Sequence, residues 1–137
     1  MSSQVLIGLD VGEKRIGVSV ADTGVRIAVP FETIEVDGGE IQRIAELVLK
    51  EDATTLVLGY PRNQAGEATT QTDYVEQFAK RLEDLDVKIA FQDESLTSVM
   101  AEQQLIAHKK PYSKGDIDSH AAAIILQDYL EVYYGWF

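Results

Sequence analysis

The sequence contains no cysteine among its 137 residues. Disulfide bonds, thiolate nucleophiles and cysteine-ligated zinc sites are therefore excluded. No apolar run approaches the ~20 residues that a transmembrane helix needs. The first four residues, Met-Ser-Ser-Gln, do not begin the basic and then apolar pattern of a signal peptide. We therefore expect a cytoplasmic protein, an address that the absence of cysteine permits.

Positive charge is also scarce. The chain has 12 Lys and Arg against 23 Asp and Glu, which gives a formal net charge of -11. Affinity for a phosphate backbone comes mainly from Lys and Arg, so this balance argues against a protein that coats DNA. An enzyme that holds a nucleic acid transiently, through metal ions and a few local cations, agrees with it. The length and the 45% hydrophobic content predict one domain over residues 1–137.

The first third of the chain has the pattern of three strands. Residues 5–9 form a continuous apolar run, typical of a strand buried on both faces, and residues 16–20 form a second. A third extended segment runs roughly over residues 26–36, where Pro30 indicates an edge or a bulge. Because the connecting turns are short, we expect these strands to be antiparallel.

The rest of the chain alternates helical and extended patterns. Helices are expected over residues 41–48, 75–85, 97–107 and 117–133, and strands over 56–58 and 87–91. Gly59-Tyr60-Pro61 is expected to end the fourth strand, and Thr97 or Ser98 to cap the third helix. The order β-β-β-α-β-α-β-α-α predicts an α/β fold with a five-stranded mixed sheet.

Three acidic residues are candidates for chemistry. Asp10 follows a buried strand between two glycines, Glu94 follows the fifth strand beside Asp93, and Asp118 precedes the apolar body of the last helix. Each has a structural alternative, namely a turn hydrogen bond, a favourable helix dipole or a place in a helix cap. For each acid taken alone, the structural role explains its position at least as well as a catalytic role does.

Taken together, the positions of the three acids point to a site. Asp10, Glu94 and Asp118 lie at strand ends and at the start of a buried helix, where sites form in α/β sheets. An ionised carboxylate in a buried place is costly unless it is paired or bound to metal. Hard oxygen ligands suit Mg²⁺ or Mn²⁺. Two such ions about 4 Å apart can activate water for phosphodiester hydrolysis.

Four motifs resemble the YqgF/RuvX family in order and spacing, over nearly the whole chain. They are Gly8-Leu9-Asp10-Val11-Gly12 through Ile16-Gly17-Val18-Ser19-Val20, Leu58-Gly59-Tyr60-Pro61, Asp93-Glu94-Ser95-Leu96-Thr97-Ser98 and Asp118-Ser119-His120-Ala121-Ala122. The resemblance implies a ribonuclease-H-like fold related to Holliday-junction resolvases, with strand order 3-2-1-4-5. It also implies a nuclease that matures the 5′ end of the 16S ribosomal RNA precursor in ribosome biogenesis. Asp10, Glu94 and Asp118 match the acidic positions of the family.

The sequence departs from the family pattern at three positions. Ser95 stands where the family usually has Arg, Met100 where Glu is common, and Tyr60 where Leu is common. Without the Arg, a planar fork that binds phosphate is missing beside the site. The implied strand order also places the fifth strand two spacings, roughly 9.5 Å, from the first. Glu94 must therefore reach back from a loop to share an ion with Asp10.

Several cations are expected on the same rim of the sheet and are predicted to bind substrate. They are Lys14 and Arg15 in the first turn, Arg62 after the fourth strand, and Lys114 in the loop before Asp118. Such a group is the local footprint that an acidic nuclease needs. The alternative for each is an ordinary solvated surface charge. His120 is more often a packing residue on a buried helix, and we leave it out of the predicted site.

Three functions remain open. The preferred one is a metal-dependent nuclease that acts on structured RNA, as a monomer or a homodimer, with no membrane partner. The second is a junction-resolving DNA endonuclease that uses the same residues on branched DNA. The third is a module that binds a nucleotide or RNA without hydrolysis, since the hairpin around Asp10 also looks like the phosphate loop of actin-like ATPases. Those ATPases close two such domains over the nucleotide, and this chain has the length for one.

Overall fold

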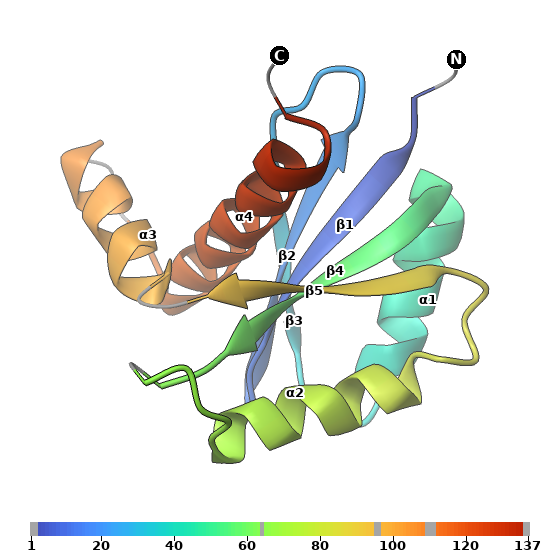
Figure 1. The fold of residues 1–137 in the computed structure, drawn as a ribbon, viewed down its shortest axis with the longest axis horizontal. Helices are drawn as coiled ribbons and strands as arrows, with labels where there is room; N and C mark the ends of the chain where they lie inside the picture. Colours follow the sequence, from blue (N-terminus) through green and yellow to red (C-terminus); the bar gives the residue numbers. More distant parts are fainter. Residues whose placement is uncertain (1–2, 64, 95–96, 109–111, 136–137) are drawn as a thin grey trace.

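The fold is that of a computed structural model, which describes residues 3–63, 65–94, 97–108 and 112–135. Helices and strands alternate along these residues much as the sequence predicts (Figure 1). Their bounds are β1 Val5–Val11, β2 Arg15–Asp22, β3 Val29–Glu35, α1 Glu40–Glu51, β4 Ala53–Pro61, α2 Thr70–Arg81, β5 Lys88–Glu94, α3 Thr97–Ala107 and α4 Lys114–Tyr133. Within the described residues, no helix is both long and apolar enough to cross a membrane.

The strands form one five-stranded sheet in the order β3-β2-β1-β4-β5. β1 pairs antiparallel with β2, and β2 pairs antiparallel with β3. β4 pairs parallel with β1 on one side and with β5 on the other. The mixed sheet and its order confirm the ribonuclease-H-like fold expected from the sequence.

The third strand begins later than expected, at Val29. Arg26 has a positive φ of 63° and donates its backbone N–H to the carbonyl oxygen of Asp22 at 2.7 Å, so the chain is still turning there. A left-handed residue cannot continue a strand. The expectation for Pro30 is confirmed, because β3 is an edge strand and its register with β2 shifts between Val18 and Ser19.

Two other expected boundaries were wrong. Gly59-Tyr60-Pro61 does not end β4 but continues it, because these residues pair with residues 92–94 of β5. Lys114 does not lie in a loop, since it is the first residue of α4. Ser113 is the N-cap of that helix, and its hydroxyl accepts the backbone N–H of Asp116 at 3.2 Å. Because Ser113 caps a backbone N–H of the first turn, the helix begins at Lys114, three residues before the predicted start at Ile117.

The two faces of the sheet are covered by different helices (Figure 1). α1 and α2 lie on one face and close the larger apolar core, which includes Ile44 from α1 and Phe78 from α2. α4 lies across the other face and closes a smaller core with Ile125 and Leu126. α3 packs beside α4. The carboxyl ends of β4 and β5 therefore open next to the start of α4.

Candidate carboxylate site

Asp10 lies near the end of β1 on the face that α4 covers. Residues alternate between faces along a strand, and Gly8 on the same side of β1 lies against the α4 residues Ala122 and Leu126. Burial first, and then the negative charges of Glu94 and Asp118, together raise the pKa of Asp10 from 3.8 to about 8. The three predicted acids are therefore neighbours on the face of the sheet that α4 covers, and each is partly buried.

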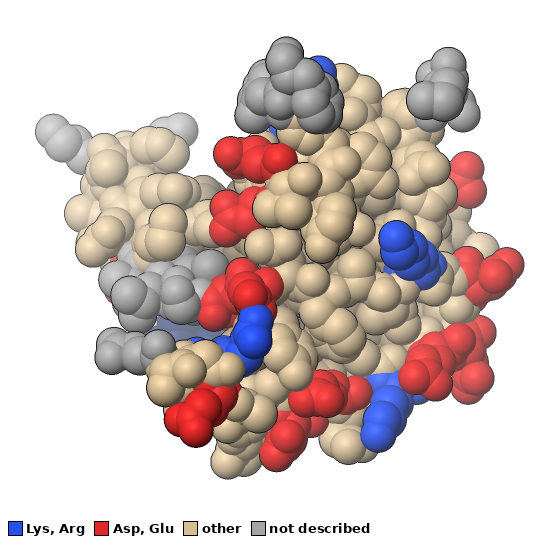
Figure 2. Space-filling model, in the orientation of Figure 1, with Lys and Arg blue, Asp and Glu red and all other residues tan. Residues whose placement is uncertain are grey.

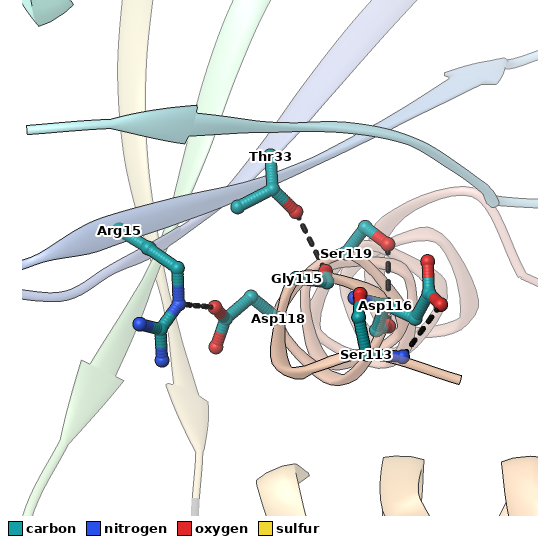
Figure 3. Close-up of polar contacts among 7 residues, drawn as sticks. All are labelled: Arg15, Thr33, Ser113, Gly115, Asp116, Asp118 and Ser119. Atoms are coloured by element: carbon teal, nitrogen blue, oxygen red, sulfur yellow. Dashed lines mark hydrogen bonds and ion pairs between the residues drawn. The ribbon is translucent and has the colours of Figure 1, made fainter.

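Asp118 is brought to Asp10 by a glycine. Gly17 of β2 is the register partner of Asp10, and a Cβ on Gly17 would lie 1.9 Å from the backbone oxygen of Asp118. Only a residue without a side chain allows the first turns of α4 to approach β2 so closely. The Asp118 carboxylate then accepts a hydrogen bond from Nε of Arg15 at 2.7 Å (Figure 3).

A second glycine lets Glu94 reach the site. Glu94 is the last residue of β5 rather than a loop residue, and its carboxylate bends back over Gly59 of β4. A Cβ on Gly59 would lie 2.7 Å from Oε1 of Glu94. Because Leu58 pairs with Leu9, Gly59 stands beside Asp10 in the register. The Glu94 side chain therefore covers the first of the two strand spacings, from β5 to β4, over an empty glycine position, and its carboxylate comes near enough to Asp10 to raise the pKa of that residue.

The start of α4 is held by a set of short polar contacts (Figure 3). Thr33 of β3 donates its hydroxyl to the backbone oxygen of Gly115 at 2.6 Å. The backbone N–H of Ser113 donates to the Asp116 carboxylate at 2.9 Å, and Ser119 donates its hydroxyl to the backbone oxygen of Asp116 at 3.2 Å. Asp116 is thus a capping residue, whereas Asp118 is the acid of this helix start that lies near Asp10 and pairs with Arg15.

The predicted cations fall into two groups. Arg15 and Arg62 are engaged in ion pairs, Arg15 with Asp118 and Arg62 with Asp93. Lys14, in the turn before β2, and Lys114 are exposed. On the face drawn in Figure 2, most of the surface is neither acidic nor basic, and red acidic side chains are more common than blue basic ones. The structure therefore leaves the role of these cations in substrate binding as a prediction.

The sequence did not identify the two glycines as parts of the site. Gly17 and Gly59 carry no chemistry, and their contribution depends on what packs against them. Their position was a usable signal, because Gly8, Gly17 and Asp10 share one face once the register of the hairpin is known. His120, which we left out, has a buried Nδ1 with no hydrogen-bond partner among the described residues.

The donor set suits a hard divalent cation. Three carboxylates from β1, β5 and α4 supply only oxygen ligands, as Mg²⁺ or Mn²⁺ prefer. Burial and the nearby charges of Glu94 and Asp118 raise the pKa of Asp10, and a bound cation would oppose both effects. In the part of the chain that the structure describes, no three acidic or histidine side chains stand at ligand spacing as they are. One oxygen of Asp118 is instead bonded to Arg15.

Comparison with known proteins places these features in a family. The family model described as "RuvX: Holliday junction resolvase" matches residues 4–132. A protein of Chloroflexus aurantiacus is 42% identical over 136 residues, covering 96% of this chain and 89% of its own. One of Synechocystis sp. is 43% identical over 138 residues, covering 96% and 91%. Both carry the name "Putative pre-16S rRNA nuclease".

Solved structures show the same fold at low sequence identity. The structure titled "T. thermophilus RuvC in complex with Holliday junction substrate" has a TM-score of 0.59 and 16% identity, and covers 96% of this chain and 97% of its own. A complex of Fowlpox virus resolvase with Holliday junction DNA has a TM-score of 0.54 and 13% identity, with 94% and 98% covered. At such identities the likeness concerns the fold alone.

Proposed function

We infer that this chain, which belongs to the RuvX family, is a nuclease that hydrolyses phosphodiester bonds with Asp10, Glu94 and Asp118 as its catalytic acids. The observation that carries this proposal is that the three acids lie near one another on the α4 face of the sheet. Each comes from a different element, and the pKa of Asp10 responds to both of the others. Carboxylates grouped in this way, in a fold that supports nucleases, are suited to metal-assisted hydrolysis.

The proposed substrate is the precursor of 16S ribosomal RNA. The support is the name of relatives at 42% and 43% identity, which this chain matches over 96% of its length. The protein would act in the cytoplasm as a monomer or homodimer. A second candidate, branched DNA, is favoured by the family description and by the likeness to junction resolvases. The carboxylate site serves either substrate, because both reactions cleave a phosphodiester.

Asp10, Glu94 and Asp118 would hold Mg²⁺ or Mn²⁺. When bound, the ion supplies an activated water and neutralises charge that develops on the phosphate. The protein contributes the positions of the three carboxylates, which β1, β5 and α4 hold near one another. Asp10, which is protonated below a pKa of about 8, must give up its proton to serve as a ligand.

Arg15 is the cation best placed to hold the scissile phosphate. Asp118 fixes it through Nε alone, and the two terminal nitrogens have no hydrogen bond to any described residue (Figure 3). A guanidinium oriented in this way presents a planar fork that matches phosphate oxygens. Lys14, Arg62 and Lys114 would contact the substrate backbone farther from the reacting bond.

The experiment that tests this proposal is cleavage of precursor RNA and branched DNA with Mn²⁺. The wild-type protein is compared with Asp10→Asn, and Asp116→Asn serves as the control. Asp116 belongs to the same helix start as Asp118 but caps the helix. We expect Asp10→Asn to abolish cleavage and Asp116→Asn to retain it. Binding of both substrates by the wild type without any cleavage would show a binding module instead.

A further inference from the structure

A groove of about 530 Å³ lies between α2 and the edge strand β5, outside the carboxylate site. Phe91 and Ile89 of β5 and Tyr60 of β4 line it from the sheet, and Glu76 and Lys80 line it from α2. Phe91 is 41% exposed although it belongs to a strand. An aromatic ring that is exposed to water on a rigid strand is unfavourable, and such exposed apolar surface can mark a binding site.

The groove contains an ordered aromatic pair. The ring centroids of Tyr60 and Phe91 are 5.2 Å apart, with 63° between the ring planes. The guanidinium carbon of Arg62 lies 5.5 Å from the centre of the Tyr60 ring. The Tyr60 hydroxyl donates to Oε1 of Glu76 at 3.1 Å, which ties the ring to α2. These contacts fix Tyr60 and support Phe91 as a rigid platform.

The groove and the carboxylate site lie on opposite faces of the sheet, and both are near the carboxyl ends of β4 and β5. Tyr60 directly follows Gly59, against which the Glu94 carboxylate lies, and Phe91 precedes Glu94 by three residues on the same strand. The aromatic rings point to the α2 face, whereas the carboxylates point to the α4 face. Arg62, which follows β4, pairs with Asp93 of β5, the register partner of Tyr60.

We propose that this groove takes an unpaired nucleobase of the substrate strand, stacked on Phe91, a few nucleotides from the scissile phosphate. The inference rests on the proposed nuclease function and names a feature of its substrate. Stacking on an aromatic side chain is available to any base, but a base held in a duplex cannot enter. The groove therefore selects strands that are unpaired next to the cut.

The charges around the groove agree with a base rather than a backbone as the occupant. Glu76 of α2 and Glu83, just after the end of α2, line it and would repel phosphate oxygens. The same carboxylates can accept hydrogen bonds from the amino and imino groups of a base. Arg62 and Lys80 are the nearby cations that a flanking phosphate would meet. A base would therefore face the carboxylates inside the groove, and its sugar-phosphate would turn outward toward the cations.

The test uses single-stranded oligonucleotides with 2-aminopurine at successive positions around the cleavage site. Ca²⁺ replaces Mn²⁺ so that the strand stays intact. Wild type is compared with Phe91→Leu, with Phe91→Tyr as the ring-preserving variant. Phe31→Leu is the matched control, because Phe31 is 38% exposed on β3, the opposite edge of the sheet. Thermal melting checks that all variants fold.

We expect the wild type, Phe91→Tyr and Phe31→Leu to quench the fluorescence at one or two adjacent positions. Phe91→Leu should lose that quenching and bind the strand about tenfold more weakly, because stacking contributes about 1–3 kcal/mol per base. Binding and cleavage by the wild type without position-specific quenching would overturn the base pocket alone. Absence of both binding and cleavage would overturn the nuclease proposal and the pocket with it. A wild-type dimer that Phe91→Leu converts to monomer would assign the groove to a second copy of the chain and overturn the inference.

Discussion

The two faces of the sheet are built in opposite ways. On the face of α1 and α2, fully buried bulky residues such as Leu9, Leu58 and Phe78 fill the space between layers. On the face of α4, the corresponding strand positions include Gly17 and Gly59. The first face gains apolar burial, which is the main source of stability. The second gives up part of that burial so that a helix backbone and three carboxylates can come close together.

The difference separates general packing from the proposed carboxylate site. Packing against α1 and α2 is a matter of volume, and residues of similar size can replace one another there. Packing against α4 is a matter of distance, because the Asp118 backbone lies on Gly17 and the Glu94 carboxylate lies on Gly59. Mutations on the two faces should therefore separate stability from activity.

The largest effect on stability is expected from Phe78→Ala on the α1 and α2 face. Phe78 is 2% exposed, and truncation of a buried Phe removes apolar burial and leaves a cavity, at a cost of about 3–5 kcal/mol. Chemical denaturation followed by circular dichroism measures this loss. Cleavage per folded molecule should stay at the wild-type level, because other residues of α2 and the sheet line the groove beside Phe91, and a fall in cleavage would contradict this separation.

A smaller loss of stability, with loss of activity, is expected from Gly17→Ala on the α4 face. The new Cβ would meet the Asp118 backbone at 1.9 Å and push the start of α4 outward, which costs about 1–3 kcal/mol. Cleavage should fall far more than the melting temperature accounts for. Gly115→Ala is the control, because its Cβ would meet Thr33 at an ordinary 3.5 Å. Equal activity in both variants would contradict the packing role of Gly17.

Asp10→Asn should raise the melting temperature of the metal-free protein, on the order of 5 °C at pH 9. The pKa of Asp10 is about 8 in the folded chain against 3.8 for an ordinary Asp. The folded state thus holds its proton more tightly than the unfolded state, and stability falls as pH rises from about 4 through 8. Because Asn does not ionise, the variant lacks this fall.

The measurement is thermal melting of wild type and Asp10→Asn between pH 4 and pH 9, without divalent ions. The difference in melting temperature between the two proteins should increase with pH and become constant above the pKa of Asp10 in the folded protein. Mg²⁺ or Mn²⁺ should then raise the melting temperature of the wild type more than that of the variant. A variant that melts lower than the wild type at every pH would support a structural role for Asp10.

The smallest effect on stability is expected from replacing Lys14, Arg62 and Lys114 together by Ala. Surface charges typically contribute within about 0.5 kcal/mol, so folding should be nearly unchanged. RNA binding should weaken, and each lost phosphate contact should flatten the plot of log affinity against log salt by about 0.7–0.9. A salt titration with Ca²⁺ in place of Mg²⁺ measures the slope. Superimposable slopes would show that substrate is held elsewhere.

Much of the fold follows from local patterns. The apolar runs of β1 and β2 and the helical spacing of α1 are short-range features, and the sequence predicts them directly. The predicted boundaries at Arg26 and at Gly59-Tyr60-Pro61 were wrong because each depends on a partner. Arg26 turns toward Asp22, and the second segment is held in the sheet by β5. The local pattern of residues does not predict which distant segments pair as strands.

The same division holds for the candidate site. The sequence by itself determined the three acids, since Asp10, Glu94 and Asp118 each stand where a strand ends or a helix starts, and the motifs around them resemble one family. Only the tertiary structure decided how the Glu94 carboxylate reaches over β4 toward Asp10 and why the start of α4, with Asp118, lies against β2. Both depend on contacts of Gly59 and Gly17 with residues far along the chain. The physical reason is that a glycine contributes by leaving space, and what fills that space is fixed only when the layers pack.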